Sequence, residues 1–247
     1  MLSKAKIKFI ASLKIKKHRL EQQLFTAEGA KTINELLSFS SLVREIYCLE
    51  SWSYTHQQLL QNTSVTCEVV SEDELKKISS LTTPNEVLAV CSIPQNSYSE
   101  ATLRQELCLA LDGIHDPGNM GTIIRIADWF NIPYLFCSDD CVDAYNAKTV
   151  QASMGSIARV KVFETSLEDL FIKYSKLPVI VTVLNGEDVF STPKPNRGFL
   201  LIGSEAKGVS ERLLNYATNK ITIPRTGKAE SLNAAVATGI ICALFKN

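Results

Sequence analysis

The segment with the densest set of groups for chemistry lies near the end of the chain, at residues 221–237. Its short apolar start, 221–224, predicts a strand; a polar loop follows, and Ser231, Leu232 and Asn233 predict the start of a helix. A strand, loop and helix in this order place backbone N–H groups and short polar side chains around a ligand, because the first N–H groups of a helix have no partner within it. The segment therefore predicts a small-molecule site.

A second loop of this kind follows the apolar run 107–112. Residues 113–121 are rich in Gly and Pro and lead into a helix expected near 120–130. Open α/β sheets bind ligands in such loops, at the carboxyl ends of their strands. Arg125 would project from the side of this helix opposite its apolar stripe. An arginine there is by default a solvated charge or a surface ion pair, so Arg125 alone indicates no function.

The elements that would carry these two loops belong to a C-terminal α/β domain. From residue 107 strand and helix patterns alternate, which predicts a mainly parallel sheet covered by helices. The expected strands are 107–112, 133–137, 178–184, 199–203 and 221–223. The expected helices lie near 120–130, 143–153, 166–176, 209–217 and 232–245. The last helix is apolar or small nearly all round, which predicts burial on more than one side, for example in a subunit interface.

The first 93 residues predict a smaller α/β domain. Its expected helices are 3–20, 27–39, 54–61 and 72–80, and its expected strands are 46–49, 65–70 and 87–91. The polar segment 94–100 has the composition of a linker. We therefore expect a first domain at 1–94, a linker at 95–106 and a second domain at 107–247.

Charge and composition bound the function further. Basic and acidic residues are equal in number, 26 each, so the net charge indicates no polyanionic partner. The first 20 residues are nevertheless basic and free of acidic residues, a pattern that fits a polyanion contact, a solvated helix face or a mitochondrial presequence. No apolar run approaches the ~20 residues that cross a bilayer, which predicts a cytoplasmic protein with no membrane contact.

The seven cysteines lie mostly in apolar runs, which predicts buried, reduced thiols. Cys137 and Cys141 form the only close pair. No histidine or second cysteine pair is near enough in the sequence to complete a zinc set. We expect no metal.

Three motifs, taken in order, resemble those of the SpoU (TrmH-like) family of RNA ribose 2'-O-methyltransferases in the SPOUT superfamily. The first, Asn-x-Gly-x-x-x-Arg-x-Ala, is matched by Asn119, Gly121, Arg125 and Ala127. The second is similar to Ile-Gly-Ser-Glu-Ala-Lys-Gly at 202–208, and the third to Ile-Pro at 223–224 followed by Ser-Leu-Asn at 231–233. Each match alone is weak, but their order and spacing make the combination specific.

The resemblance covers nearly the whole chain. Residues 4–93 resemble the ribosomal-protein-L30e-like substrate-binding domain that often precedes the catalytic domain, so the basic start belongs to that domain and not to a transit peptide. Residues 143–156 are similar to the family pattern between the first two motifs. Two positions depart from the family: Arg225 stands where Met is common, and Gln151 where Arg is frequent. The departure at Arg225 puts in doubt whether the rim of the cofactor pocket is as in the family. The departure at Gln151 puts in doubt one RNA contact.

The resemblance implies transfer of the methyl group of S-adenosylmethionine to a ribose 2'-hydroxyl. The catalytic set it implies is Asn119, Arg125, Glu205, Ser231 and Asn233. The cofactor-binding set it implies is Leu184, Gly203, Ile223, Pro224 and Leu232. A guanidinium stays protonated in proteins. We therefore expect Arg125, held by Asn119 and Glu205, to orient the ribose and a phosphate, while the phosphate or a water takes the proton.

The resemblance also implies a deep trefoil knot in the C-terminal domain, an exception to the rule against threading, and a homodimer formed through that domain. RNA contacts are expected from Lys14, Lys16, Lys17 and Arg19. Phosphate contacts of this kind give affinity and not sequence choice. Ribosomal RNA is favoured over transfer RNA as the substrate.

Three other classes of protein share part of this pattern. A nicotinamide-dependent oxidoreductase would show Gly-x-Gly-x-x-Gly after a first strand, which the 117–121 loop does not. A hydrolase could use His115 and Asp116, but no Gly-x-Ser-x-Gly elbow accompanies them. An RNA-binding protein that has kept the fold and lost catalysis remains the strongest alternative. It would lack part of the motif set, all of which is present.

Overall fold

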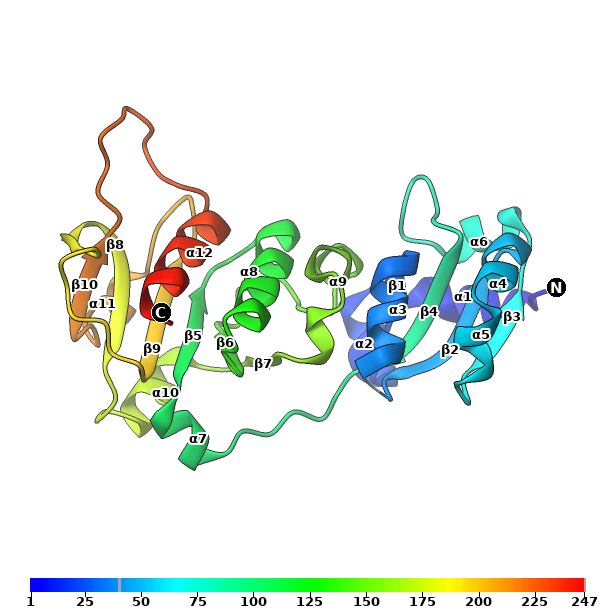
Figure 1. Cartoon of the computed structure of the whole chain (residues 1–247), viewed down its shortest axis with the longest axis horizontal. Helices are drawn as coiled ribbons and strands as arrows, with labels where there is room; N and C mark the ends of the chain where they lie inside the picture. Colours follow the sequence, from blue (N-terminus) through cyan, green and yellow to red (C-terminus); the bar gives the residue numbers. More distant parts are fainter. Residues whose placement is uncertain (40, 247) are drawn as a thin grey trace. The chain divides into compact units, whose positions relative to one another are not determined.

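The computed structural model describes residues 1–39 and 41–246, and their contacts group into two compact units. Unit 1 comprises Met1–Gln95 and Tyr145–Ala158, and unit 2 comprises Asn96–Ala144 and Arg159–Asn247. Figure 1 labels the elements of both. The grouping differs from the expected one because the segment at 145–158 joins unit 1. Grouping by contacts does not identify folding domains, so the boundaries at 94 and 107 stay a prediction.

Unit 2 is built on a six-stranded sheet in the order β10-β8-β9-β5-β6-β7, and each of its pairings is parallel. The strands are β5 (Leu107–Asp112), β6 (Tyr134–Cys137), β7 (Lys161–Glu164), β8 (Val179–Asp188), β9 (Gly198–Gly203) and β10 (Asn219–Thr222). All residues of β5 are buried, as in strands that are covered on both faces. The expected parallel sheet is confirmed, and its carboxyl ends share one edge.

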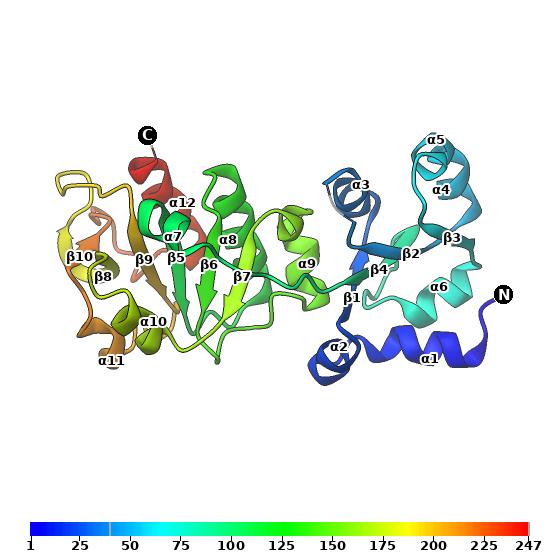
Figure 2. The same ribbon diagram turned by 90° about the horizontal axis from the view of Figure 1, so that it is seen from below.

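Helices cover both faces of this sheet. They are α7 (Glu100–Gln105), α8 (Pro117–Trp129), α10 (Leu167–Lys173), α11 (Glu211–Leu214) and α12 (Ala234–Phe245). Helices α8 and α12 lie side by side in both ribbon views (Figures 1 and 2). Helices α7, α10 and α11 share one apolar core with the sheet. Because side chains alternate along a strand, Cys108 and Ala110 face that core and Leu109 and Leu111 face away from it.

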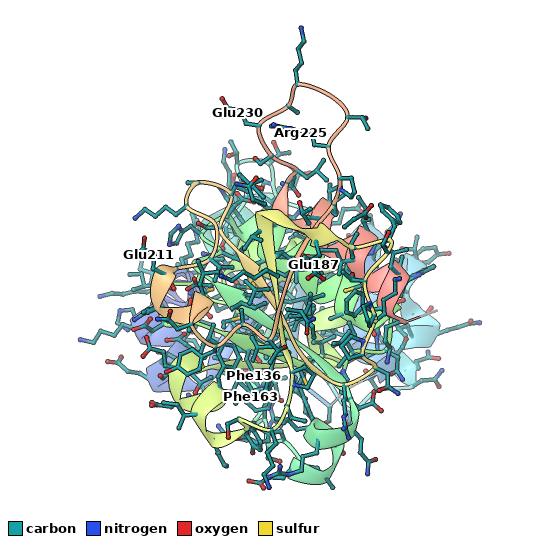
Figure 3. All side chains as sticks on the ribbon, turned by 90° about the vertical axis from the view of Figure 1, so that its left-hand side faces the viewer. Phe136, Phe163, Glu187, Glu211, Arg225 and Glu230 are labelled. Atoms are coloured by element: carbon teal, nitrogen blue, oxygen red, sulfur yellow. The ribbon has the colours of Figure 1, made fainter. Side chains whose placement is uncertain are left out.

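Aromatic rings fill much of this core. Phe136 and Phe163 stack with ring centres 5.2 Å apart, and Figure 3 shows them close together. Tyr98, which precedes α7, meets both rings edge-on. Edge-to-face pairs of this kind stabilise by about 0.5–1.5 kcal/mol each beyond the area that they bury. The segment expected to be a linker therefore packs against unit 2 at Tyr98.

Unit 1 contains a four-stranded mixed sheet in the order β1-β4-β2-β3. The strands are β1 (Leu24–Glu28), β2 (Val43–Cys48), β3 (Thr66–Val69) and β4 (Val87–Ser92). The helices are α1 (Lys4–Ser12), α2 (Lys16–Gln22), α3 (Ala30–Phe39), α4 (Glu50–Thr55), α5 (Gln57–Gln61), α6 (Glu72–Ile78) and α9 (Ala147–Ser153). Helices α1 and α6 share an apolar core with β2 and β4, and α3 and α9 pack against β1.

The expectation of one helix over residues 3–20 is wrong. The chain leaves the helical path after Ser12 and begins a second helix at Lys16. Arg19 explains the break, because its Nη1 donates to the carbonyl oxygens of Leu13 and Lys14 at 2.8 and 2.9 Å. These carbonyls lie just past the end of α1, so the guanidinium satisfies acceptors that the turn leaves without helical partners.

Helix α12 is buried on one side within the chain and not on several. Its buried residues include Thr238, Ile241 and Cys242, whereas Val236 is half exposed. The rest of the chain therefore buries only part of the apolar surface of α12. None of the helices in the described residues has the length and apolar character needed to span a membrane.

Candidate active site

The first side of the site is the start of α8. Asp116 occupies the N-cap position, and its Oδ1 accepts a hydrogen bond from the Asn119 backbone N–H at 2.8 Å. Pro117 at the first helical position has its φ already set for a helix. This cap fixes Asn119 in the first turn, at the carboxyl edge of the parallel sheet.

The second side is the start of α12. Asn233 is the N-cap residue, and its Oδ1 accepts hydrogen bonds from the N–H groups of Ala235 and Val236 at 3.0 and 3.1 Å. An amide has two donors as well as an acceptor, so this cap leaves the Nδ2 group free to bond elsewhere. It donates to Asn119 Oδ1 at 2.8 Å and to Glu205 Oε1 at 2.7 Å.

The third side is a short loop after β9. Ser204 and Gly208 exchange two backbone hydrogen bonds, of 3.2 and 2.8 Å, which close the loop. Gly203 allows this closure, because a Cβ atom there would lie 2.2 Å from the carbonyl carbon of Gly208. Glu205 lies within the loop and is thereby directed at the starts of α8 and α12.

One oxygen of Glu205 joins the three sides. Its Oε1 accepts from Asn119 Nδ2 at 2.8 Å, from Asn233 Nδ2 at 2.7 Å and from the Ala234 backbone N–H at 3.2 Å. The starts of two helices are a favourable position for a carboxylate, because helix dipoles present positive charge there. Asn119, Glu205 and Asn233, here called the motif triangle, therefore form one connected and largely exposed polar group.

Arg125 and Ser231 do not join the motif triangle. Both side chains are exposed, and within the described part of the chain neither makes a hydrogen bond or ion pair. The expectation that Asn119 and Glu205 hold Arg125 is not met, since both bond to Asn233 instead. The guanidinium of Arg125 is thus available to a ligand.

The residues expected around the cofactor lie on β8, β9 and the projecting loop that follows β10. Leu184 and Leu232 are 73% and 46% exposed, which is unusual for large apolar side chains in a folded unit. Thr222 Oγ1 donates to the Leu184 carbonyl at 3.1 Å, which brings β8 next to Ile223 and Pro224. The loop, marked by Arg225 and Glu230, projects from unit 2 in Figure 3.

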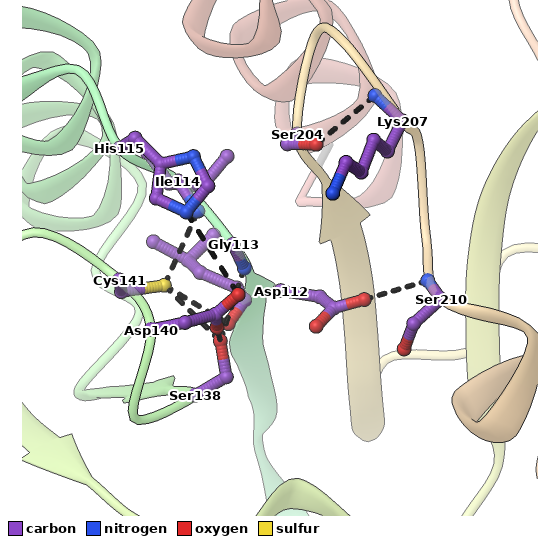
Figure 4. Close-up of polar contacts among 11 residues, drawn as sticks. Asp112, Gly113, Ile114, His115, Ser138, Asp140, Cys141, Ser204, Lys207 and Ser210 are labelled. Carbon is purple, nitrogen blue, oxygen red and sulfur yellow. Dashed lines mark hydrogen bonds and ion pairs between the residues drawn. The ribbon is translucent and has the colours of Figure 1, made fainter.

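Asp112 is a residue of this site that sequence reasoning missed. It ends β5 in register with Gly203, is 5% exposed, and accepts a hydrogen bond from the Ser210 backbone N–H at 2.7 Å (Figure 4). A buried carboxylate needs such a partner. The bond fixes the far end of the loop that carries Glu205. The sequence did contain a signal for this residue, because Asp112 is a carboxylate at the end of an otherwise apolar strand.

Cys141 lies in a polar group next to Asp112 (Figure 4). Its sulfur accepts from the Ile114 N–H at 3.3 Å and lies 3.4 Å from the Ser138 hydroxyl. The thiol of Cys137, and then these two groups, lower the pKa of Cys141 to about 7, although burial opposes the shift. Both thiols are buried. Across the described residues, no three His, Cys, Asp or Glu side chains gather into a possible metal site.

The basic residues of unit 1 divide into two kinds. Lys14 and Lys17 are exposed, and Lys16 is half buried. Arg19 is 3% exposed, and both carbonyls that its guanidinium binds belong to the turn after α1. The RNA contact expected of Arg19 is therefore contradicted by its burial. An RNA contact from the three lysines stays a prediction.

Comparison with known proteins identifies the family of the chain. The model of the SpoU rRNA Methylase family matches residues 106–243, and that of the MRM3-like substrate binding domain matches residues 4–89. The chain is 32% identical over 239 residues to the 23S rRNA (guanosine(2553)-2'-O)-methyltransferase RlmP of Bacillus subtilis, a match covering 96% of this chain and 94% of that protein.

Two solved structures are similar over the full length. A TrmH-family protein from Porphyromonas gingivalis has a TM-score of 0.84 at 35% identity, covering 99% of this chain and 98% of that one. The AdoMet-bound rRNA methyltransferase of Sinorhizobium meliloti has a TM-score of 0.84 at 28% identity, covering 100% and 96%. Fold and geometry define an α/β protein with a connected polar group at the carboxyl edge of a parallel sheet. The chain belongs to the SpoU rRNA methylase family.

Proposed function

We propose that this chain methylates the 2'-hydroxyl of a ribose in ribosomal RNA. It is an S-adenosylmethionine-dependent RNA methyltransferase of the SpoU family. The observation that carries the proposal is the motif triangle, whose bonds join positions 86 and 114 residues apart in the sequence. All three family motifs contribute a residue to it. The choice of ribosomal RNA rests on relatives such as RlmP, which is named for that substrate.

The residues present fit S-adenosylmethionine, which supplies a methyl group on a positively charged sulfur. Leu184 and Leu232 offer the exposed apolar surface that a nucleoside would cover. Ile223 and Pro224 lie on the segment next to Leu184. Because Gly203 has no side chain, the end of the 204–208 loop packs against the end of β9. A neutral, flat adenine is suited to apolar side chains and backbone groups of this kind.

The methyl transfer needs the ribose hydroxyl held in line with the methyl group and its proton removed. In this proposal Arg125 orients the ribose and an adjacent phosphate, since its guanidinium is exposed and stays protonated. The phosphate or a water takes the proton. The motif triangle and Ser231 lie against the ribose, and Asp112 acts indirectly, by positioning the loop of Glu205.

The assembly that we infer is a homodimer formed through the C-terminal domain. Helices α8 and α12 pack together yet leave Trp129 and Val236 79% and 51% exposed, and a second subunit would cover them. We also infer a trefoil knot in the domain at 107–247, an RNA-binding domain at 1–94, and a cytoplasmic location, where a bacterial ribosomal RNA substrate is found. Family membership supports each of these.

The test is calorimetric titration of the protein with S-adenosylmethionine, followed by methyl transfer to unmodified ribosomal RNA transcripts and mass spectrometry of the digested nucleosides. We expect one site per subunit and a 2'-O-methylated nucleoside as product. Leu232→Trp should abolish cofactor binding, because the larger ring would fill the proposed pocket. Ile172→Trp, an exposed position on α10, is the matched control and should bind normally.

Three outcomes would count against the proposal. Cofactor binding that survives Leu232→Trp would place the pocket elsewhere. A methyl group found on a base would exclude ribose chemistry. Transfer to transfer RNA transcripts, with none to ribosomal RNA, would be consistent with the enzyme class but would show that ribosomal RNA is not the substrate.

A further inference from the structure

Unit 1 has a hollow of its own, of about 580 Å³, lined by α3 and by the junction of α4 and α5. Three of its lining side chains are amides, Asn34, Gln57 and Gln58. Two others are rings, Tyr54 and His56. Among its described lining residues there is no carboxylate, ammonium or guanidinium. This is the lining expected for a neutral, flat ligand with hydrogen-bonding edges, and not for an anion.

The two rings differ in how they are held. Tyr54 is 82% exposed and lines the hollow. The His56 ring is fixed in place: it stacks on Trp52 at 4.3 Å and 12°, and its Nδ1 lies 3.0 Å from the Trp52 carbonyl oxygen. One wall of the hollow is thus rigid, and the exposed tyrosine beside it is of the kind on which nucleobases stack.

The amides supply the hydrogen-bonding edge. Gln57 and Gln58 are exposed, and each carries both a donor and an acceptor. In the described residues Asn34 Oδ1 is buried and has no hydrogen-bond partner. Buried polar atoms are nearly always paired, so this unpaired oxygen would be satisfied if the Asn34 amide, which lines the hollow, turned towards a ligand that brings an N–H group. Lys31, exposed one turn earlier on α3, could take an adjacent phosphate.

We propose that this hollow receives one unpaired nucleobase of the RNA substrate. The base stacks on Tyr54 and its edge pairs with the amides of Asn34, Gln57 and Gln58. The inference rests on the proposed function, since it takes the substrate to be RNA. It adds a base-binding site to a unit for which the sequence predicted phosphate contacts alone, and so gives that unit a means of choosing single-stranded over paired RNA.

The test measures fluorescence anisotropy of the full chain with a labelled 12-nucleotide single-stranded RNA and with the same RNA annealed to its complement. Tyr54→Ala should weaken binding of the single strand by about 5- to 160-fold, the loss typical of one base–aromatic stack. Tyr54→Phe keeps the ring and should bind like the unaltered chain. Val69→Ala, an exposed site on β3, is the surface control and should change nothing.

The outcomes separate this inference from the proposed function. Equal binding by Tyr54→Ala and the unaltered chain, an equal loss on the duplex, or no binding of the single strand by the unaltered chain would each overturn the base site. Calorimetry with S-adenosylmethionine should give the same affinity for Tyr54→Ala as for the unaltered chain. If the chain transfers no methyl group but the Tyr54-dependent binding is found, the proposed function fails and the base site stands.

Discussion

At the scale of single residues, Asn233 does two things with one amide. Its oxygen caps α12, and its nitrogen donates to both Glu205 and Asn119. The sequence predicted the residue types of this group from their motifs. It could not predict that they bond to one another, because the contacts cross 28 to 114 residues of chain and depend on how the loops pack.

This division of roles predicts the effect of Asn233→Asp. A carboxylate still caps the helix, so the thermal midpoint should change little. The donor is lost, however, and two negative groups then face each other at Glu205, which should open the motif triangle. We expect methyl transfer to fall by about 100-fold, as for a small misplacement of a catalytic group. Steady-state kinetics with tritiated S-adenosylmethionine measures this loss.

Asn146→Asp is the matched control for that substitution. Asn146 caps α9 through its oxygen, which accepts from the Lys148 N–H at 3.0 Å, and it has no part in the motif triangle. Its activity and thermal midpoint should both stay close to those of the unaltered chain. If Asn233→Asp kept full activity while folded, the motif triangle would be unnecessary for catalysis.

Arg125 shows where a motif misleads about geometry. It follows Asn119 by six positions, about 240° further round a helix at 100° per residue, so the two side chains leave α8 on different sides. Both belong to one sequence motif, which suggested that they touch. The helix period shows that they point in different directions, and in the structure Asn119 bonds to Glu205 while Arg125 is exposed.

At the scale of elements, the sequence predicted the strands made of continuous apolar runs and missed two strands that carry polar residues. β5 covers the residues expected of it, 107–112. β7 was missed because Lys161–Glu164 is half exposed and has a charged residue at each end. β1 was missed although it is buried, because its polar residues Thr26 and Glu28 interrupt the apolar pattern. The break between α1 and α2 was missed because it involves hydrogen bonds from the Arg19 side chain to backbone carbonyls five and six residues earlier, which the apolar pattern does not reveal.

Gly203 gives a prediction at this scale. A Cβ at 203 would overlap backbone atoms of Gly208 and Val209. Backbone atoms cannot move aside as the end of a flexible side chain can. Gly203→Ala should therefore lower stability by about 1–3 kcal/mol, the usual cost of overpacking. It should also displace the Glu205 loop and weaken S-adenosylmethionine binding. Thermal unfolding and calorimetry measure the two effects.

The control for this substitution is Gly227→Ala in the projecting loop. A Cβ at 227 would have no atom within 4 Å, so its addition should leave the thermal midpoint unchanged. An equally small change for Gly203→Ala would mean that the loop gives way at little cost. The close approach of strand and loop would then have no part in forming the site.

At the scale of the whole molecule, zero net charge hides an uneven distribution. The basic start of the chain is partly neutralised by its own fold: Lys6 pairs with Glu45 at 2.7 Å, and Arg19 is buried. The candidate phosphate contacts are three lysines near the turn between α1 and α2, Lys14, Lys16 and Lys17, of which Lys17 also lies 3.9 Å from Glu21. Composition could not separate these from Arg19, because burial decides which charges reach solvent.

These three lysines predict how RNA affinity depends on salt. Each phosphate contact releases counterions, so the logarithm of affinity falls with the logarithm of salt concentration by about 0.7 per contact on a single strand. Replacing Lys14, Lys16 and Lys17 by Ala should flatten that slope by about 2 and weaken all RNA sequences alike. Titrations of a single-stranded RNA from 50 to 300 mM KCl, roughly the range in which such slopes are measured, give the value.

Lys76→Ala with Lys77→Ala is the control, since both side chains are exposed on α6 of the same unit. It removes positive charge without touching the turn after α1, so its slope should stay near that of the unaltered chain. An equal flattening in both variants would mean that the unit attracts RNA by its overall charge. A flattening confined to the first variant places the phosphate backbone along α2, because only contacts within about a Debye length contribute.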